Sequence, residues 1–234
     1  MLALSDFPLI WLVVFGAALI ALICLCRIVA TTADAQDDEA QRFSKRLNLA
    51  LTLWLLCAIT YALVIGLNFT SFIPTLAIPL ALGSVVMFRP TATRLLQNLP
   101  LHLLILLGTY RVAGGIFIYA YAQHDLLSYG FAFNAGWGDV LTGVLAPAVA
   151  YLVLKRIPWA FVAVLVWTCI GIGDLILAPI SANLYGAERL VDFPLNLIPL
   201  FLGPPFGILL HLITVRSAWL QLKPNHRIVH EQTQ

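Results

Sequence analysis

The chain has 234 residues, of which 61% are hydrophobic and only 10% are charged. Soluble domains carry about 25% charged residues, so this chain has too little polar surface to coat a soluble globule of its size. The composition therefore excludes an ordinary soluble protein, while the formal net charge of +2 points to no particular partner.

Apolar segments of about 20 residues recur along the whole chain, which is the length that a helix needs to cross a bilayer. The period-2 alternation of barrel strands is absent, so we predict an all-α transmembrane bundle. The seven predicted spans cover residues 7–28, 47–68, 70–88, 99–121, 136–154, 157–179 and 194–215. The third span holds Pro74 and Pro79, and a re-entrant path there would invert the topology downstream. We predict one membrane domain over residues 1–222 and a polar cytosolic tail over residues 223–234.

Basic residues test this count, because Lys and Arg accumulate in cytosolic connections. The first, third and fifth connections and the tail hold Arg27, Arg42, Lys45, Arg46, Arg89, Arg94, Lys155, Arg156, Arg216, Lys223 and Arg227. Of the other two basic residues, Arg189 falls on the opposite side and Arg111 lies inside the fourth span. We therefore predict an outside N-terminus, a cytosolic C-terminus and a location in the plasma or inner membrane.

The first span resembles a signal peptide, because Ala33, Asp34 and Ala35 look like a small-residue cleavage site. Its start lacks a basic region and its apolar run is too long for a signal sequence, so we expect a retained anchor. The charges between Thr31 and Arg46 predict a solvated cytosolic loop whose second half is compatible with a helix.

Three ionisable residues lie inside the predicted spans, namely Arg111, Asp139 and Asp174. Charged groups in the hydrocarbon core face the bundle interior and find partners there. Counting residues along each span at 1.5 Å per residue places all three in the outer half of the membrane. The sequence leaves two interpretations open. One is a structural ion pair that locks three helices together, and the other is a polar pocket in which the second carboxylate meets a ligand, ion or proton.

Further polar side chains are candidates for the rim of this pocket: Tyr110, Asn134, Trp137 and Asn196. Four prolines are expected to bend span seven and open space beside it: Pro194, Pro199, Pro204 and Pro205. Glycines concentrate in spans four to six, where small residues allow helices to approach closely: Gly108, Gly114, Gly115, Gly136, Gly138, Gly143, Gly171 and Gly173.

No metal site is predicted, and the four cysteines lie in apolar runs as small buried residues. A haem b bound between His102 and His211 is a weaker alternative, because both histidines were expected toward the cytosolic ends of their spans. No lysine lies inside a span, which leaves a retinal Schiff base without an attachment point. Zincin, nucleophile-elbow and Walker A motifs are also absent from the sequence.

These observations favour a polytopic membrane protein that binds a small ligand or ion, of the sensor or transport type. The alternatives are a membrane enzyme that uses Asp139 or Asp174 as acid or base on a lipid-like substrate, and a structural subunit of a membrane complex. We expect membrane lipids as partners, together with a small ligand or ion from the external side, and we expect no nucleic-acid partner.

Overall fold

The computed structural model describes residues 8–65, 69–124, 126–186, 190 and 192–222. Within this part of the chain every regular element is a helix. The elements are α1 (Pro8–Asp34), α2 (Asp38–Val64), α3 (Phe69–Met87), α4 (Pro90–Asn98), α5 (Leu101–Leu107), the 3₁₀ helix η2 (Gly108–Gly114), α6 (Gly115–His124), α7 (Tyr129–Leu154), α8 (Ala160–Tyr185), the π-helix η4 (Ile198–Leu202) and α9 (Pro204–Leu222).

Six helical stretches in the described residues are long and apolar enough to cross a membrane. They are α1, α2, the continuous run Leu101–Ala122, α7, α8 and the run Ile198–Leu222. A seventh is reached if Pro74–Met87 and Pro90–Asn98, which are bent by 84° against each other, count as one broken span. The prediction of an all-helical protein of membrane type is confirmed.

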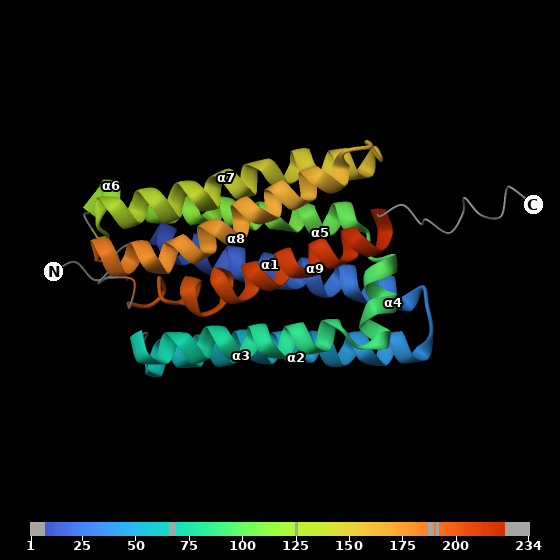
Figure 1. Ribbon diagram of the computed structural model, residues 1–234. Helices are drawn as coiled ribbons and strands as arrows, with labels where there is room; N and C mark the ends of the chain where they lie inside the picture. Colours follow the sequence, from blue (N-terminus) through green and yellow to red (C-terminus); the bar gives the residue numbers. More distant parts are fainter. Residues whose placement is uncertain (1–7, 66–68, 125, 187–189, 191, 223–234) are drawn as a thin grey trace, which may run out of the picture.

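The helices lie side by side along one common direction, and α4 runs across one end of the bundle (Figure 1). Helices α1 and α9 lie between the α7–α8 pair and the α2–α3 pair (Figure 1). The run Ile198–Leu222, which contains α9, is the most enclosed of the candidate spans. Of its most apolar stretch of 18 residues, 72% are buried. Helix α1 begins at the end of the bundle opposite to the one where α9 ends (Figure 1).

The helix expected in the second half of the segment between Thr31 and Arg46 is confirmed, but the loop predicted for the rest of the segment is reduced to a short turn. Helix α1 continues to Asp34 and α2 begins at Asp38. The Asp37 side chain caps α2 by accepting a hydrogen bond of 2.7 Å from the backbone N–H of Ala40. A capping aspartate followed by two further acids suits the positive end of a helix, so the charges start a helix instead of filling a loop.

Two breaks in the helical backbone shape the centre of the bundle. The fourth predicted span changes from α-helix to 3₁₀ helix between Gly108 and Gly114, where glycines weaken the α-helix. The last span begins with a π-helical turn, Ile198–Leu202, and α9 proper starts at Pro204. Breaks of this kind are frequent at functional sites in membrane helices.

Candidate functional site

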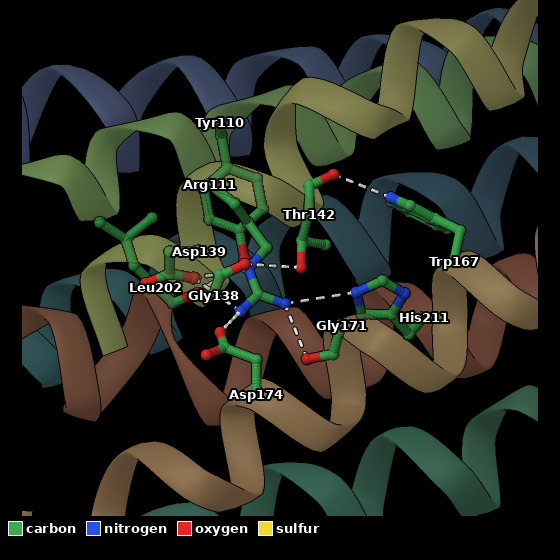
Figure 2. A network of polar contacts seen from close by, with 10 residues as sticks. All are labelled: Tyr110, Arg111, Gly138, Asp139, Thr142, Trp167, Gly171, Asp174, Leu202 and His211. Carbon is green, nitrogen blue, oxygen red and sulfur yellow. Dashed lines mark hydrogen bonds and ion pairs between the residues drawn. The ribbon is translucent and has the colours of Figure 1, made fainter. Parts of the chain in front are cut away.

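Arg111 lies in the 3₁₀ segment and is only 2% exposed. Its Nε donates a hydrogen bond of 2.6 Å to Oδ1 of Asp139 on α7, and its Nη2 lies 2.6 Å from the same oxygen. Nη2 also donates to Oδ2 of Asp174 on α8, and Nη1 donates at 2.9 Å to the carbonyl of Gly171 (Figure 2). One guanidinium therefore joins three helical segments through charged or strongly polar contacts.

The centre lies toward the middle of its helices, and Asp139 and Asp174 are somewhat nearer to the helix ends that the sequence predicts to be outside. Arg111 is ten residues from the start of the run Leu101–Ala122 and eleven from its end. Asp139 is ten residues after Tyr129, because α7 starts seven residues earlier than the predicted residue 136. Ser128 causes this early start, since its Oγ accepts a hydrogen bond of 3.4 Å from the backbone N–H of Phe131 and caps the helix.

His211 on α9 closes the fourth side of the centre. Its Nε2 is 3.4 Å from Arg111 Nη1, and its ring centroid is 4.3 Å from that of Trp167 (Figure 2). Because an arginine nitrogen only donates, His211 Nε2 accepts and the ring proton lies on Nδ1. Trp167 is held in turn by a hydrogen bond of 2.9 Å from its Nε1 to the carbonyl of Thr142.

The residues do not fit the haem alternative. A haem iron needs the Nε2 or Nδ1 lone pair of two facing histidines. His211 Nε2 is directed at Arg111, which lies nine residues further along its helical run than His102. Nine residues correspond to about 13 Å of helix, so the two histidines do not share a depth.

Glycines let the three helices close around the guanidinium. A Cβ atom added at any of three positions would collide with a side chain of the centre: Gly114 with Asp139, Gly138 with Asp174, and Gly171 with His211. By contrast, a Cβ at Gly173 would meet no atom within 4 Å. The close helix approach expected of the small residues is thus located at the charged groups themselves.

The four predicted rim residues have different positions. Tyr110 is close to the centre and donates a hydrogen bond of 2.7 Å from its hydroxyl to the carbonyl of Leu202 in the π-helical turn. Asn196 is buried but donates at 3.0 Å to the carbonyl of Ala62 on α2.

The other two rim candidates are not brought to the centre. Asn134 is exposed and lies 3.4 Å from Ser181, and Trp137 is 51% exposed on the outside of α7. Residues two and five positions before Asp139 lie on other faces of a helix with 3.6 residues per turn. Gly171, Thr142, Trp167 and His211 were not linked to Arg111 from the sequence. Their contacts depend on how α7, α8 and α9 are rotated.

A small cavity adjoins Asp139 and Arg111 on the side of α1 and the π-helical turn. Its volume is about 20 Å³, and its walls include Val14, Tyr110 and Leu202. A cavity needs about 10–15 Å³ to hold a water molecule, so this one has room for about one water.

The charges of the centre do not balance. One guanidinium faces two carboxylates, whose side chains are 13% and 10% exposed for Asp139 and Asp174. With both acids ionised the cluster carries one excess negative charge in a region of low dielectric. A proton or a small cation would remove that excess. Among the described residues no group of three His, Cys, Asp or Glu side chains is arranged to hold a metal ion.

A family model matches a large part of the chain. The model of a family described as a domain of unknown function, DUF8737, matches residues 75–218. This stretch is more than half of the chain and contains Arg111, Asp139, Asp174 and His211. Neither the curated proteins nor the solved structures give a match.

Proposed function

This chain belongs to the DUF8737 family, whose description names no activity, and from the geometry we propose that it binds a proton or a small cation at the centre formed by Arg111, Asp139 and Asp174. Binding at this centre would serve a sensor or a transport-type membrane protein. The proposal rests on one observation, namely that the buried carboxylate of Asp139 and the partly buried carboxylate of Asp174 share a single guanidinium.

The excess negative charge supports the proposal. An uncompensated charge at the centre of a bilayer costs several kcal/mol, so such a carboxylate binds a proton or a cation, or is paired. Arg111 has already committed its nitrogen atoms to Asp139, Asp174, Gly171 and His211. Its donors are therefore all in use, and its single positive charge balances only one of the two carboxylates.

The size of the adjoining cavity favours a proton or an ion over an organic ligand. Sites for small organic molecules usually have volumes of about 300–1,000 Å³, whereas the cavity beside Asp139 measures about 20 Å³. The same limit argues against a lipid-like substrate at Asp139, as the enzyme alternative requires. The structural-subunit alternative predicts a centre that binds neither protons nor cations.

We further propose seven spans, with the N-terminus outside and the C-terminus cytosolic in a plasma or inner membrane. Helix α3 has 19 residues, and at 1.5 Å per residue its length of about 28 Å is close to the thickness of the hydrocarbon core. Counting α3 as a span agrees with α1 beginning and α9 ending at opposite ends of the bundle (Figure 1).

Infrared spectroscopy of the purified chain tests the proposal directly. A protonated carboxyl group gives a carbonyl band that a carboxylate lacks, and we expect such a band to titrate with pH. It should be lost in Asp139→Asn or in Asp174→Asn. Asp37→Asn is the matched control, because this carboxylate also contacts an arginine but is 52% exposed. Its substitution should leave the band unchanged.

A second measurement covers cation binding. Thermal stability is compared in lithium, sodium, potassium and choline chloride at equal ionic strength. Stabilisation by one small cation that disappears in the Asp174→Asn variant would support a cation as the bound species. A chain with no titrating carboxyl band and no cation-specific stabilisation would have a purely structural centre, and the proposal would be rejected.

A further inference from the structure

A second and much larger cavity is lined by residues of α2, α3 and α4. Helix α4 and the turn between α1 and α2 lie at the same end of the bundle (Figure 1). The volume of this cavity is about 570 Å³, within the range typical of binding sites for small molecules. Residues of α2, the end of α3 and the start of α4 form its walls. It is separate from the Arg111 centre and shares no lining residue with the cavity there.

The charged walls of this cavity are positive. Three arginines line it, Arg42, Arg46 and Arg89, and all three side chains are exposed. Within the described residues, the Arg42 side chain donates one hydrogen bond of 3.2 Å, from Nε to the backbone carbonyl of Asp38, and both of its terminal nitrogens stay available there. Arg46 and Arg89 form no ion pair with any residue in the described part of the chain.

Glu39 is the acidic residue of the lining, and its carboxylate is paired with Arg94, which also contacts Asp37 and lies outside the cavity. Its Oε2 accepts a hydrogen bond of 2.7 Å from Nη2 of Arg94, which does not line the cavity. Its Oε1 accepts a hydrogen bond of 2.5 Å from the hydroxyl of Thr91. Among the lining residues, three arginines therefore outnumber one acid that is already paired, and an anion that enters the cavity meets a net positive site.

The remaining walls are mainly apolar. Phe43, Leu47 and Ala50 recur on α2 at intervals of four and three residues, so they lie on one face of that helix, and Val86 on α3 lines the cavity as well. This arrangement joins a cluster of guanidinium groups to an apolar strip that runs along the helices toward the interior of the membrane. A free inorganic anion would use the guanidinium groups alone.

We propose that this cavity binds an anionic phospholipid, with its phosphate on Arg42, Arg46 and Arg89 and an acyl chain along Leu47 and Val86. Guanidinium groups match phosphate oxygens in geometry as well as charge. Basic pockets between membrane helices on the cytosolic side recognise phospholipid headgroups in this way. The site is independent of the proton or cation binding proposed above.

Native mass spectrometry of the full chain in detergent, with added phosphatidylglycerol or phosphatidylcholine, measures the binding. We expect phosphatidylglycerol to bind and phosphatidylcholine to bind at least about tenfold more weakly, since attraction to anionic lipid is worth about 1 kcal/mol per basic residue. Each of Arg42→Gln, Arg46→Gln and Arg89→Gln should weaken the phosphatidylglycerol complex about fivefold. Arg46→Lys keeps the charge and should restore most of the affinity.

Two controls make the outcome decisive. Lys155→Gln and Arg156→Gln remove positive charge from the turn between α7 and α8, outside the cavity, and should leave the affinity unchanged. Asp174→Asn should also leave it unchanged, whatever happens at the Arg111 centre. The proposal would be overturned if both lipids bound equally well, or if the Lys155 and Arg156 variants lost as much affinity as the cavity variants. It would also be overturned if inorganic phosphate bound as tightly as phosphatidylglycerol and displaced it, because the acyl chain would then contribute nothing.

Discussion

Replacing Arg111 by leucine is the sharpest perturbation of the charged centre. The substitution removes the donor of Asp139, Asp174 and the carbonyl of Gly171 at once. Breaking a buried ion pair by removing one partner costs about 3–5 kcal/mol, and a buried carbonyl without a donor about 1–3 kcal/mol. Protonation of a stranded acid recovers part of this loss. We therefore expect Arg111→Leu to lower the free energy of unfolding by about 3–5 kcal/mol.

The chain offers a matched control in Arg94, which also faces two carboxylates. Arg94 is 48% exposed, and its partners Asp37 and Glu39 are 52% and 62% exposed. Exposed pairs of this kind contribute about 0–1 kcal/mol. Arg94→Leu should therefore change the free energy of unfolding by less than about 1 kcal/mol, although it removes the same number of ion pairs. Unfolding of both variants by a denaturing detergent, compared with the parent chain, measures the difference.

A double-mutant cycle separates the two acids. Two nitrogens of Arg111 lie 2.6 Å from Asp139, whereas one nitrogen contacts Asp174. The coupling energy with Arg111 should therefore be larger for Asp139→Asn than for Asp174→Asn, within the range of about 0.5–3 kcal/mol found for contacting residues. If Arg111→Leu and Arg94→Leu cost the same, or if both cycles are additive, burial is not what gives this centre its strength and the reasoning fails.

Two further predictions concern packing and topology. Gly138→Ala should lower the free energy of unfolding by about 1–3 kcal/mol, because the added methyl group would overlap the Asp174 carboxylate. Gly173→Ala is the control and should be neutral or slightly stabilising, because no atom lies within 4 Å of the added methyl group. A melting temperature lowered equally by both would contradict this account. For the topology, single cysteines are placed at Gln36 and Tyr185 in a cysteine-free background and labelled with a membrane-impermeant reagent. The cysteine at Gln36 should react only from the cytosolic side and the one at Tyr185 only from outside. Labelling of both from the same side would refute the proposed seven-span topology.

The depth of the charged centre shows where sequence reasoning reached its limit. Apolar length predicts a span but does not say where its helix begins, and Ser128 starts α7 well before the predicted residue 136. That shift places Asp139 ten residues into α7, whereas the predicted span placed it about one turn from its start. The loop predicted after α1 was too long for a related reason, because Asp37 acts there as a helix cap and not as a loop residue.

Length, composition and the positions of charge were enough to predict membrane helices and to single out Arg111, Asp139 and Asp174 as groups that need partners. The physics behind both is local, since a buried backbone or a buried charge in lipid is costly wherever it occurs.

Which partners meet depends on helix rotation and crossing, which many distant side chains decide together. His211 reaches Arg111 across 100 residues of sequence because Gly171 leaves room for its ring. The arginine-lined cavity likewise forms only where α2, α3 and α4 come together, and no short stretch of sequence records that meeting.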